Sequence, residues 1–119
     1  MMYGLWPDEF DGKLDEGETI FVSESDGKLI GFIALSIRNW VEGASIAPSP
    51  HVEGWYVDPE FRGKGIGTEL MKAGEKWAAD QGFKELTSDV EMENSLSLKV
   101  HEALGFEPTS KIQYFRKNL

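Results

Sequence analysis

The chain has 119 residues, with 21 acidic and 12 basic side chains and a formal net charge of −9. This length allows one compact domain with one core, so residues 1–119 are expected to form a single domain. The excess of acid argues against a nucleic-acid partner, because phosphate binding needs clustered Lys and Arg, and it favours a small cationic ligand. The sequence has no cysteine and no apolar run near the ~20 residues of a membrane span, which predicts a cytoplasmic protein without disulfides or membrane contact.

The first half of the chain predicts a loop followed by three strands. Residues 1–18 are rich in Gly, Pro and acidic residues, which is typical of a loop. The run TIFVS predicts a strand, and Asp26-Gly27 predicts a two-residue turn. The next strand, Leu29–Ile37, is almost continuously apolar, as expected for a strand covered on both faces. After a further loop, HVEGWYV at 51–57 predicts the third strand.

The second half alternates helices with strands. Residues 65–82 predict an amphipathic helix that stops at Gly82. Its apolar face comprises Ile66, Leu70, Ala73 and Trp77. The next expected elements are a strand at 83–90, a helix at Ser95–Leu104 with Asn94 as N-cap and Gly105 after its end, and a closing strand in IQYFRK. This order predicts an α+β fold with a mixed sheet and flanking helices.

Three glycines precede the long helix at alternate positions, Gly63, Gly65 and Gly67, with Arg62 and Lys64 among them. A helix start presents unpaired N–H groups and a positive dipole end, and glycines let the backbone approach a phosphate closely. The P-loop ending Gly-Lys-Ser/Thr is absent. Spacing alone therefore favours a pyrophosphate cradle but leaves an ordinary glycine-rich turn open.

A dinucleotide-binding fold is a second alternative for this loop. Its fingerprint requires a third glycine at position 68, where the chain has Thr68. Asp89 lies at a suitable distance for the ribose carboxylate, but the chain is too short for a complete doubly wound sheet. The sequence thus argues against a Rossmann domain.

The segment Arg62-Gly63-Lys64-Gly65-Ile66-Gly67 resembles the Arg/Gln-x-x-Gly-x-Gly/Ala signature of the GCN5-related N-acetyltransferases. The segments LWP, SPHVEGWYVDPEFRGKGIG and KVHEALGF together are similar to aminoglycoside 6′-N-acetyltransferases. The resemblance implies acetyl-CoA as co-substrate, no metal, and a pair of splayed strands that holds the pantetheine. It also implies that the cofactor contacts, besides that six-residue loop, are the backbone of Trp55, Tyr56 and Val57 and the side chain of Asn94.

Acetyl transfer to an amine requires a group that accepts the amine proton, and Glu53 and Asp89 are the acidic candidates. Parallel pairing of their strands would bring both to one cleft, and the resemblance implies that they bind the substrate, with Asp89 as the preferred base. His101 stands where many family members carry a tyrosine that protonates the leaving sulfur. A donor role and a purely structural role both stay open for His101, whereas His51 is interpreted as structural.

The resemblance also places Trp6 and Trp40 at the aminoglycoside site, although loop tryptophans can equally pack onto the domain. Relative to the family, the segment before LWP is short by a strand and a helix, so an exposed sheet edge and a homodimer are expected. Two other functions stay open: acetylation of another small amine or of a peptide N-terminus, and a non-catalytic module that binds coenzyme A.

Overall fold

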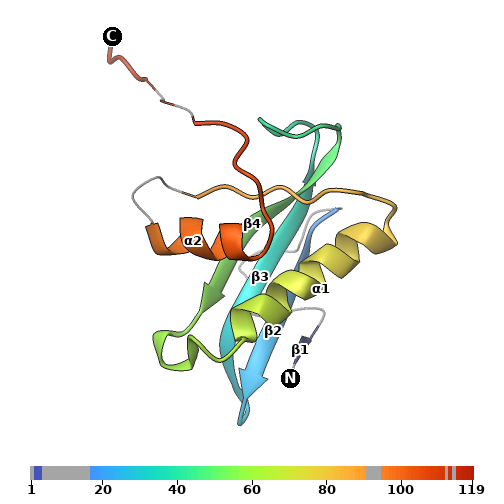
Figure 1. Ribbon diagram of the computed structural model, residues 1–119, viewed down its shortest axis with the longest axis vertical. Helices are drawn as coiled ribbons and strands as arrows, with labels where there is room; N and C mark the ends of the chain where they lie inside the picture. The colour runs from blue at the N-terminus through green and yellow to red at the C-terminus, as the bar shows by residue number, and fades with distance from the viewer. Residues whose placement is uncertain (1, 4–16, 91–94, 112, 114) are drawn as a thin grey trace.

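The computed structural model describes residues 2–3, 17–90, 95–111, 113 and 115–119 (Figure 1). Its elements in chain order are β1 (Met2–Tyr3), β2 (Thr19–Ser25), β3 (Lys28–Arg38), β4 (Ser49–Val57), the 3₁₀ helix η1 (Pro59–Phe61), α1 (Ile66–Asp80) and α2 (Ser95–Ala103). The four strands form one sheet in the order β1-β2-β3-β4, and each neighbouring pair is antiparallel. No helix in the described segments is long and apolar enough to cross a membrane.

The β2–β3 hairpin forms where the sequence predicts it. Asp26 and Gly27 both have positive φ, 50° and 78°, which is the backbone of the tight turn that matches the twist of two antiparallel strands. Ile33 and Leu35 of β3 are fully buried under α1, whereas Phe32 on the opposite face is only half-buried. The sequence predicts that both faces of this strand are buried, and the structure buries only the face that packs against α1 completely.

A β-bulge at Glu53 interrupts the pairing of β3 with β4. Ala34 pairs with Gly54 and Leu35 pairs with Val52, so Glu53 is an extra residue with no partner in the register. The bulge shifts the alternation of side chains along β4. As a result Val52 before the bulge and Trp55 after it both pack into the core beneath α1.

Helix α1 crosses one face of the sheet and contacts β2, β3 and β4 (Figure 1). Gly65, with φ 85°, is its N-cap, and Gly82, with φ 90°, lies just past its end, as the sequence predicts. Its inward face is centred on buried Leu70 and Met71, which form the core together with Ile33, Leu35 and Val52. Trp77 is partly buried against that core, in agreement with its predicted role.

The strand predicted at 83–90 is reduced to a single parallel bridge between His51 and Thr87. Thr87 N–H donates to the Pro50 carbonyl at 3.0 Å, and Val52 N–H donates to the Thr87 carbonyl at 2.8 Å. The next bond toward the start of this ladder would need an N–H from Pro50, which proline lacks. The bridge is the one contact of β4 with this segment that has β geometry within the described residues.

The C-terminal part of the chain differs from the prediction. Gly105, with φ 89°, follows α2 as expected, and Leu104 and Phe106 pack against the core. Residues 107–111, 113 and 115–119 form no strand and run away from the sheet (Figure 1). A strand needs a neighbouring edge for its hydrogen bonds, and none of the strands in the described part of the chain pairs with this segment. The predicted closing strand is therefore wrong for these residues.

Candidate active site

The glycine loop before α1 has the geometry of an anion cradle. Gly63 and Gly65 have φ of 77° and 85°, a region that disfavours residues with a Cβ atom. A Cβ built at either position would meet no heavy atom within 4 Å, so the space beside both residues is open. The first intrahelical bond runs from Glu69 N–H to the Gly65 carbonyl, at 3.0 Å. The N–H groups of the preceding residues in the loop and first turn therefore remain available for a ligand.

The basic side chains of this loop are held close to its backbone. Arg62 Nε donates to the Val57 carbonyl at 2.8 Å, and its guanidinium lies 5.6 Å from the centre of the Tyr56 ring. Lys64 Nζ lies 5.3 Å from the centre of the Phe61 ring. These contacts fix the loop to the end of β4 and leave positive charge beside the N-terminus of α1.

The edge of β4 opens toward this loop. Trp55, Tyr56 and Val57 pair with β3 on one side, while on the other side the ladder stops at the bridge between His51 and Thr87. Trp55 Nε1 donates to the Gly67 carbonyl at 3.0 Å, which ties the strand to the first turn of α1. Within the described residues, the outer edge of β4 at 55–57 is therefore separated from the segment 83–90, and this open edge leads to the glycine loop.

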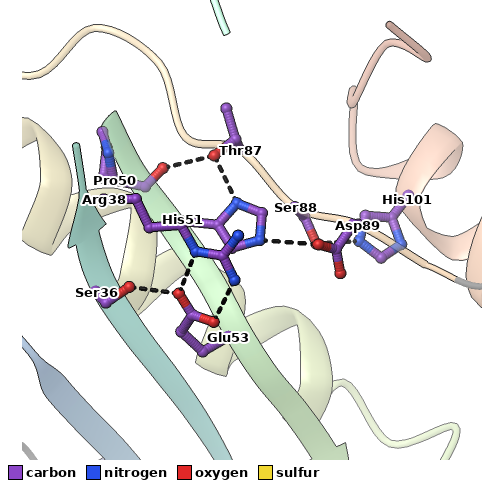
Figure 2. A network of polar contacts seen from close by, with 9 residues as sticks. All are labelled: Ser36, Arg38, Pro50, His51, Glu53, Thr87, Ser88, Asp89 and His101. Carbon is purple, nitrogen blue, oxygen red and sulfur yellow. Dashed lines mark hydrogen bonds and ion pairs between the residues drawn. The ribbon is translucent and has the colours of Figure 1, made fainter. Parts of the chain in front are cut away.

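Asp89 lies beside the same strand and is held by a histidine (Figure 2). His51 Nε2 lies 3.2 Å from Asp89 Oδ2, and His51 Nδ1 lies 2.8 Å from Thr87 Oγ1. The His51 side chain is 2% exposed and that of Asp89 is 79% exposed, so the carboxylate presents its other faces to solvent. Burial is the main cause that lowers the pKa of His51 below 6.5, with a contribution from Arg38.

Glu53 is bound to two residues of β3 (Figure 2). Arg38 donates to both of its carboxylate oxygens, from Nε at 2.7 Å and from Nη2 at 2.6 Å, and the Ser36 hydroxyl donates to the same group. These bonds, chiefly those from Arg38, lower the pKa of Glu53 from 4.5 to about 2. A carboxylate of that acidity is a weak proton acceptor, so the geometry favours Asp89 over Glu53 as the base.

The ion pair between Glu53 and Arg38 is expected to make the folded protein less stable in acid. The pKa of Glu53 is lower in the folded protein than in the unfolded chain, so its contribution is complete above the unfolded value and is lost as the pH falls from about 5 to about 2. Glu53→Gln should flatten the decline of the unfolding free energy, measured with urea, across that interval. Glu75→Gln, an exposed change on α1, is the matched control and should keep the wild-type slope. An unchanged slope in Glu53→Gln would contradict the assignment.

His101 is enclosed by polar and aromatic neighbours. Its Nδ1 donates to the Ser97 carbonyl at 2.8 Å, and its Nε2 lies 2.9 Å from Ser88 Oγ. The ring makes edge contacts with Trp55 and Phe106, at centroid distances of 5.4 and 5.2 Å. These contacts account for a structural role, and protonation of a leaving sulfur by His101 stays a prediction.

The remaining predicted site residues are differently placed. Trp40 is 68% exposed in the loop after β3, and Ile66 is half-buried at the start of α1. Trp6 and Asn94 lie outside the described residues. Sequence analysis did not assign a site role to Arg38, Ser36, His51 or Thr87, which hold the two carboxylates. The one pattern in the sequence that could have indicated these contacts is the spacing of Ser36 and Arg38, which lie two residues apart in β3 and therefore share a face of the strand.

The chain belongs to the Acetyltransferase (GNAT) family, whose model matches residues 2–106. It is 39% identical to the aminoglycoside N(6′)-acetyltransferase type 1 of Salmonella typhimurium, over 95% of this chain and 85% of that protein. It is 36% identical to the protein of the same name from Stenotrophomonas maltophilia, over 98% of this chain and 82% of that protein. The predicted family membership is confirmed.

Solved structures give the same result for the fold. The structure of AAC(6′)-Iy in complex with the bisubstrate analog CoA-S-monomethyl-acetylneamine is 38% identical, with a TM-score of 0.81, over 88% of this chain and 72% of that one. AAC(6′)-IG from Acinetobacter haemolyticus is 33% identical, with a TM-score of 0.80, over 88% of this chain and 73% of that one. The predicted α+β acetyltransferase fold is confirmed.

Proposed function

We propose that this protein transfers the acetyl group of acetyl-CoA to the 6′-amine of an aminoglycoside. The observation that carries the proposal is the open edge of β4, which runs from the glycine cradle at Gly63–Gly65 to the carboxylate of Asp89. The relatives reported above bear the corresponding name, and one solved neighbour holds an analogue that joins coenzyme A to an aminoglycoside fragment. These facts also support the predicted class of enzyme, an acyltransferase.

Coenzyme A fits the residues that this chain provides. Amide groups of the glycine loop and of the first turn of α1 would bind the pyrophosphate, with Arg62 and Lys64 adding positive charge. The pantetheine arm would lie along the backbone of Trp55–Val57, where β4 has no strand on its outer side within the described residues. A backbone N–H of that edge would stabilise the oxyanion that develops on the thioester carbonyl.

The acceptor amine arrives as an ammonium and must lose a proton before it attacks the thioester carbon. Asp89 would bind the ammonium and accept its proton, since its carboxylate is exposed beside β4. The amine then forms the C–N bond, the C–S bond breaks, and the coenzyme A thiolate leaves with a proton from solvent or from His101. Direct attack suits a chain that has no cysteine for a covalent intermediate.

A panel of amine acceptors tests the proposal. Purified protein with acetyl-CoA should acetylate aminoglycosides that carry a 6′-amino group, and should be inactive on matched aminoglycosides with a 6′-hydroxyl group. Turnover on polyamines or peptide N-termini, but on no aminoglycoside, would favour the second candidate acceptor class. Binding of coenzyme A without turnover on any amine would favour a non-catalytic module.

A homodimer and a cytoplasmic location are further parts of the proposal. The extended C-terminal segment exposes 91% of the Phe115 surface, and a second copy of the chain could cover it. Light scattering coupled to size-exclusion chromatography would measure the mass of the particle in solution.

A further inference from the structure

His51 makes polar contacts that a residue used only for packing would not need. Its imidazole is almost completely buried, yet both ring nitrogens have polar partners in the neighbouring segment 87–89. A buried aromatic position in a strand could be filled by phenylalanine without any polar partner. The outer partner of the ring, Asp89, is the exposed carboxylate that the proposed function uses as its base (Figure 2).

The hydrogen atoms of this cluster can be assigned by counting donors. An ionised Asp89 carboxylate only accepts, so His51 Nε2, at 3.2 Å from it, must carry hydrogen. In a neutral imidazole, Nδ1 is then an acceptor and receives the single hydroxyl hydrogen of Thr87 at 2.8 Å. The Pro50 carbonyl is still satisfied, because it accepts the Thr87 N–H at 3.0 Å.

The opposite tautomer is disfavoured by the same geometry. The Thr87 hydroxyl also lies in position to donate to the Pro50 carbonyl, at 2.9 Å, and Thr87 Oγ1 would then accept from Nδ1–H. The single hydroxyl hydrogen serves one of these two bonds at a time. A neutral ring would then point the bare lone pair of Nε2 at a carboxylate oxygen, which is a repulsive contact. Arg38, Glu53 and Asp89 are the charged groups that act on the ring. Burial and Arg38 lower the pKa of His51, while Asp89 and Glu53 raise it, and the net direction is downward, toward the neutral form.

We propose that His51 is a positioning residue for acetyl transfer: its Nε2–H bond holds Asp89 toward the acceptor amine, while the Thr87 hydroxyl is the partner of Nδ1. The bond restricts the rotation of a side chain that is otherwise exposed to solvent. The Asp89 carboxylate is thereby kept where it can bind an ammonium and accept its proton. This inference rests on the proposed function of Asp89 as the base.

The tautomer can be measured without any substrate. The chain contains two histidines, His51 and His101, so ¹⁵N-histidine labelling gives a spectrum with two rings. His101 is an internal control, because its Nδ1 donates to the Ser97 carbonyl and its ring should carry hydrogen on Nδ1. For His51 we expect a neutral ring at pH 7 with hydrogen on Nε2. A His51 ring with hydrogen on Nδ1 and a bare Nε2 would overturn the proposal.

Two substitutions at His51 separate positioning from packing. His51→Phe fills the space without a donor, and we expect kcat to fall about 10- to 100-fold while the affinity for coenzyme A is retained. His51→Gln retains an N–H donor and should recover part of kcat, a rescue that a purely structural role would not predict. Wild-type kcat in a folded His51→Phe protein would refute the proposal. Absence of turnover in the wild-type protein would instead count against the proposed function, and the tautomer measurement would still decide the role of His51.

Discussion

Replacement of Asp89 by asparagine is expected to lower kcat for acetyl transfer about 100- to 10,000-fold, the range that a positioned acid–base group supplies. The amide has nearly the same size as the carboxylate, but it accepts no proton at neutral pH and attracts an ammonium less strongly. The affinity for coenzyme A should be unchanged, because Asp89 contacts His51 near the start of β4, whereas the glycine loop follows the end of that strand. Steady-state kinetics and titration calorimetry with coenzyme A would measure the two effects separately.

Asp80→Asn is the matched control for this experiment. The substitution replaces a carboxylate by an amide, as Asp89→Asn does, but on the exposed side of α1. Asp80 forms an ion pair there with Lys76 at 2.7 Å. An exposed pair of this kind contributes little to stability, so both kcat and coenzyme A affinity should stay at wild-type values. If Asp89→Asn behaves like Asp80→Asn, Asp89 is not the base.

Replacement of Gly65 by alanine is expected to weaken the binding of coenzyme A about 10-fold or more, since the loss of one good interaction of ~1.4 kcal/mol corresponds to that factor. Gly65 is the N-cap of α1 with φ 85°, and an L-residue in this region is strained by about 1–2 kcal/mol. Relaxation of the strain would turn the amides of the loop away from the pyrophosphate. Calorimetry would give the affinity, and thermal unfolding would give the change in stability.

Gly82→Ala controls for the strain itself. Gly82 has φ 90° just past the other end of α1, and a Cβ there would also meet no heavy atom within 4 Å. Both variants should therefore lose similar stability, but only Gly65→Ala should bind coenzyme A more weakly. Equal affinities for coenzyme A in the two variants would contradict the assignment of the glycine loop to the binding site.

Features that depend on a few adjacent residues could be predicted from the sequence. The Asp26-Gly27 turn and the two ends of α1 need positive φ, which glycine and aspartate adopt at low cost, so the residue types reveal the backbone. The glycine loop belongs to this class, and it led to the family before any tertiary contact was known. The core face of α1 could be predicted in part, because its period of 3.6 residues is fixed by helix geometry: Leu70 is buried as predicted, whereas buried Met71 lay outside the predicted face.

Contacts between distant segments were decided only by the tertiary structure. The bulge at Glu53 depends on how β3 and β4 align, and the Glu53 carboxylate is bound by Arg38 and Ser36. The strand predicted at 83–90 is interrupted on one side of Thr87 because its partner has Pro50 in place of a donor, which no local pattern in 83–90 reveals.

The sequence alone thus determined the family and the positive φ angles of the glycine loop, because these follow from residue type and local backbone requirements. The tertiary structure alone decided that Glu53 is ion-paired with Arg38 and that Asp89 is held by a buried His51. The physical reason is that a carboxylate's chemistry depends on which charges and donors lie within a few ångströms, and those neighbours are up to 38 positions away along the chain.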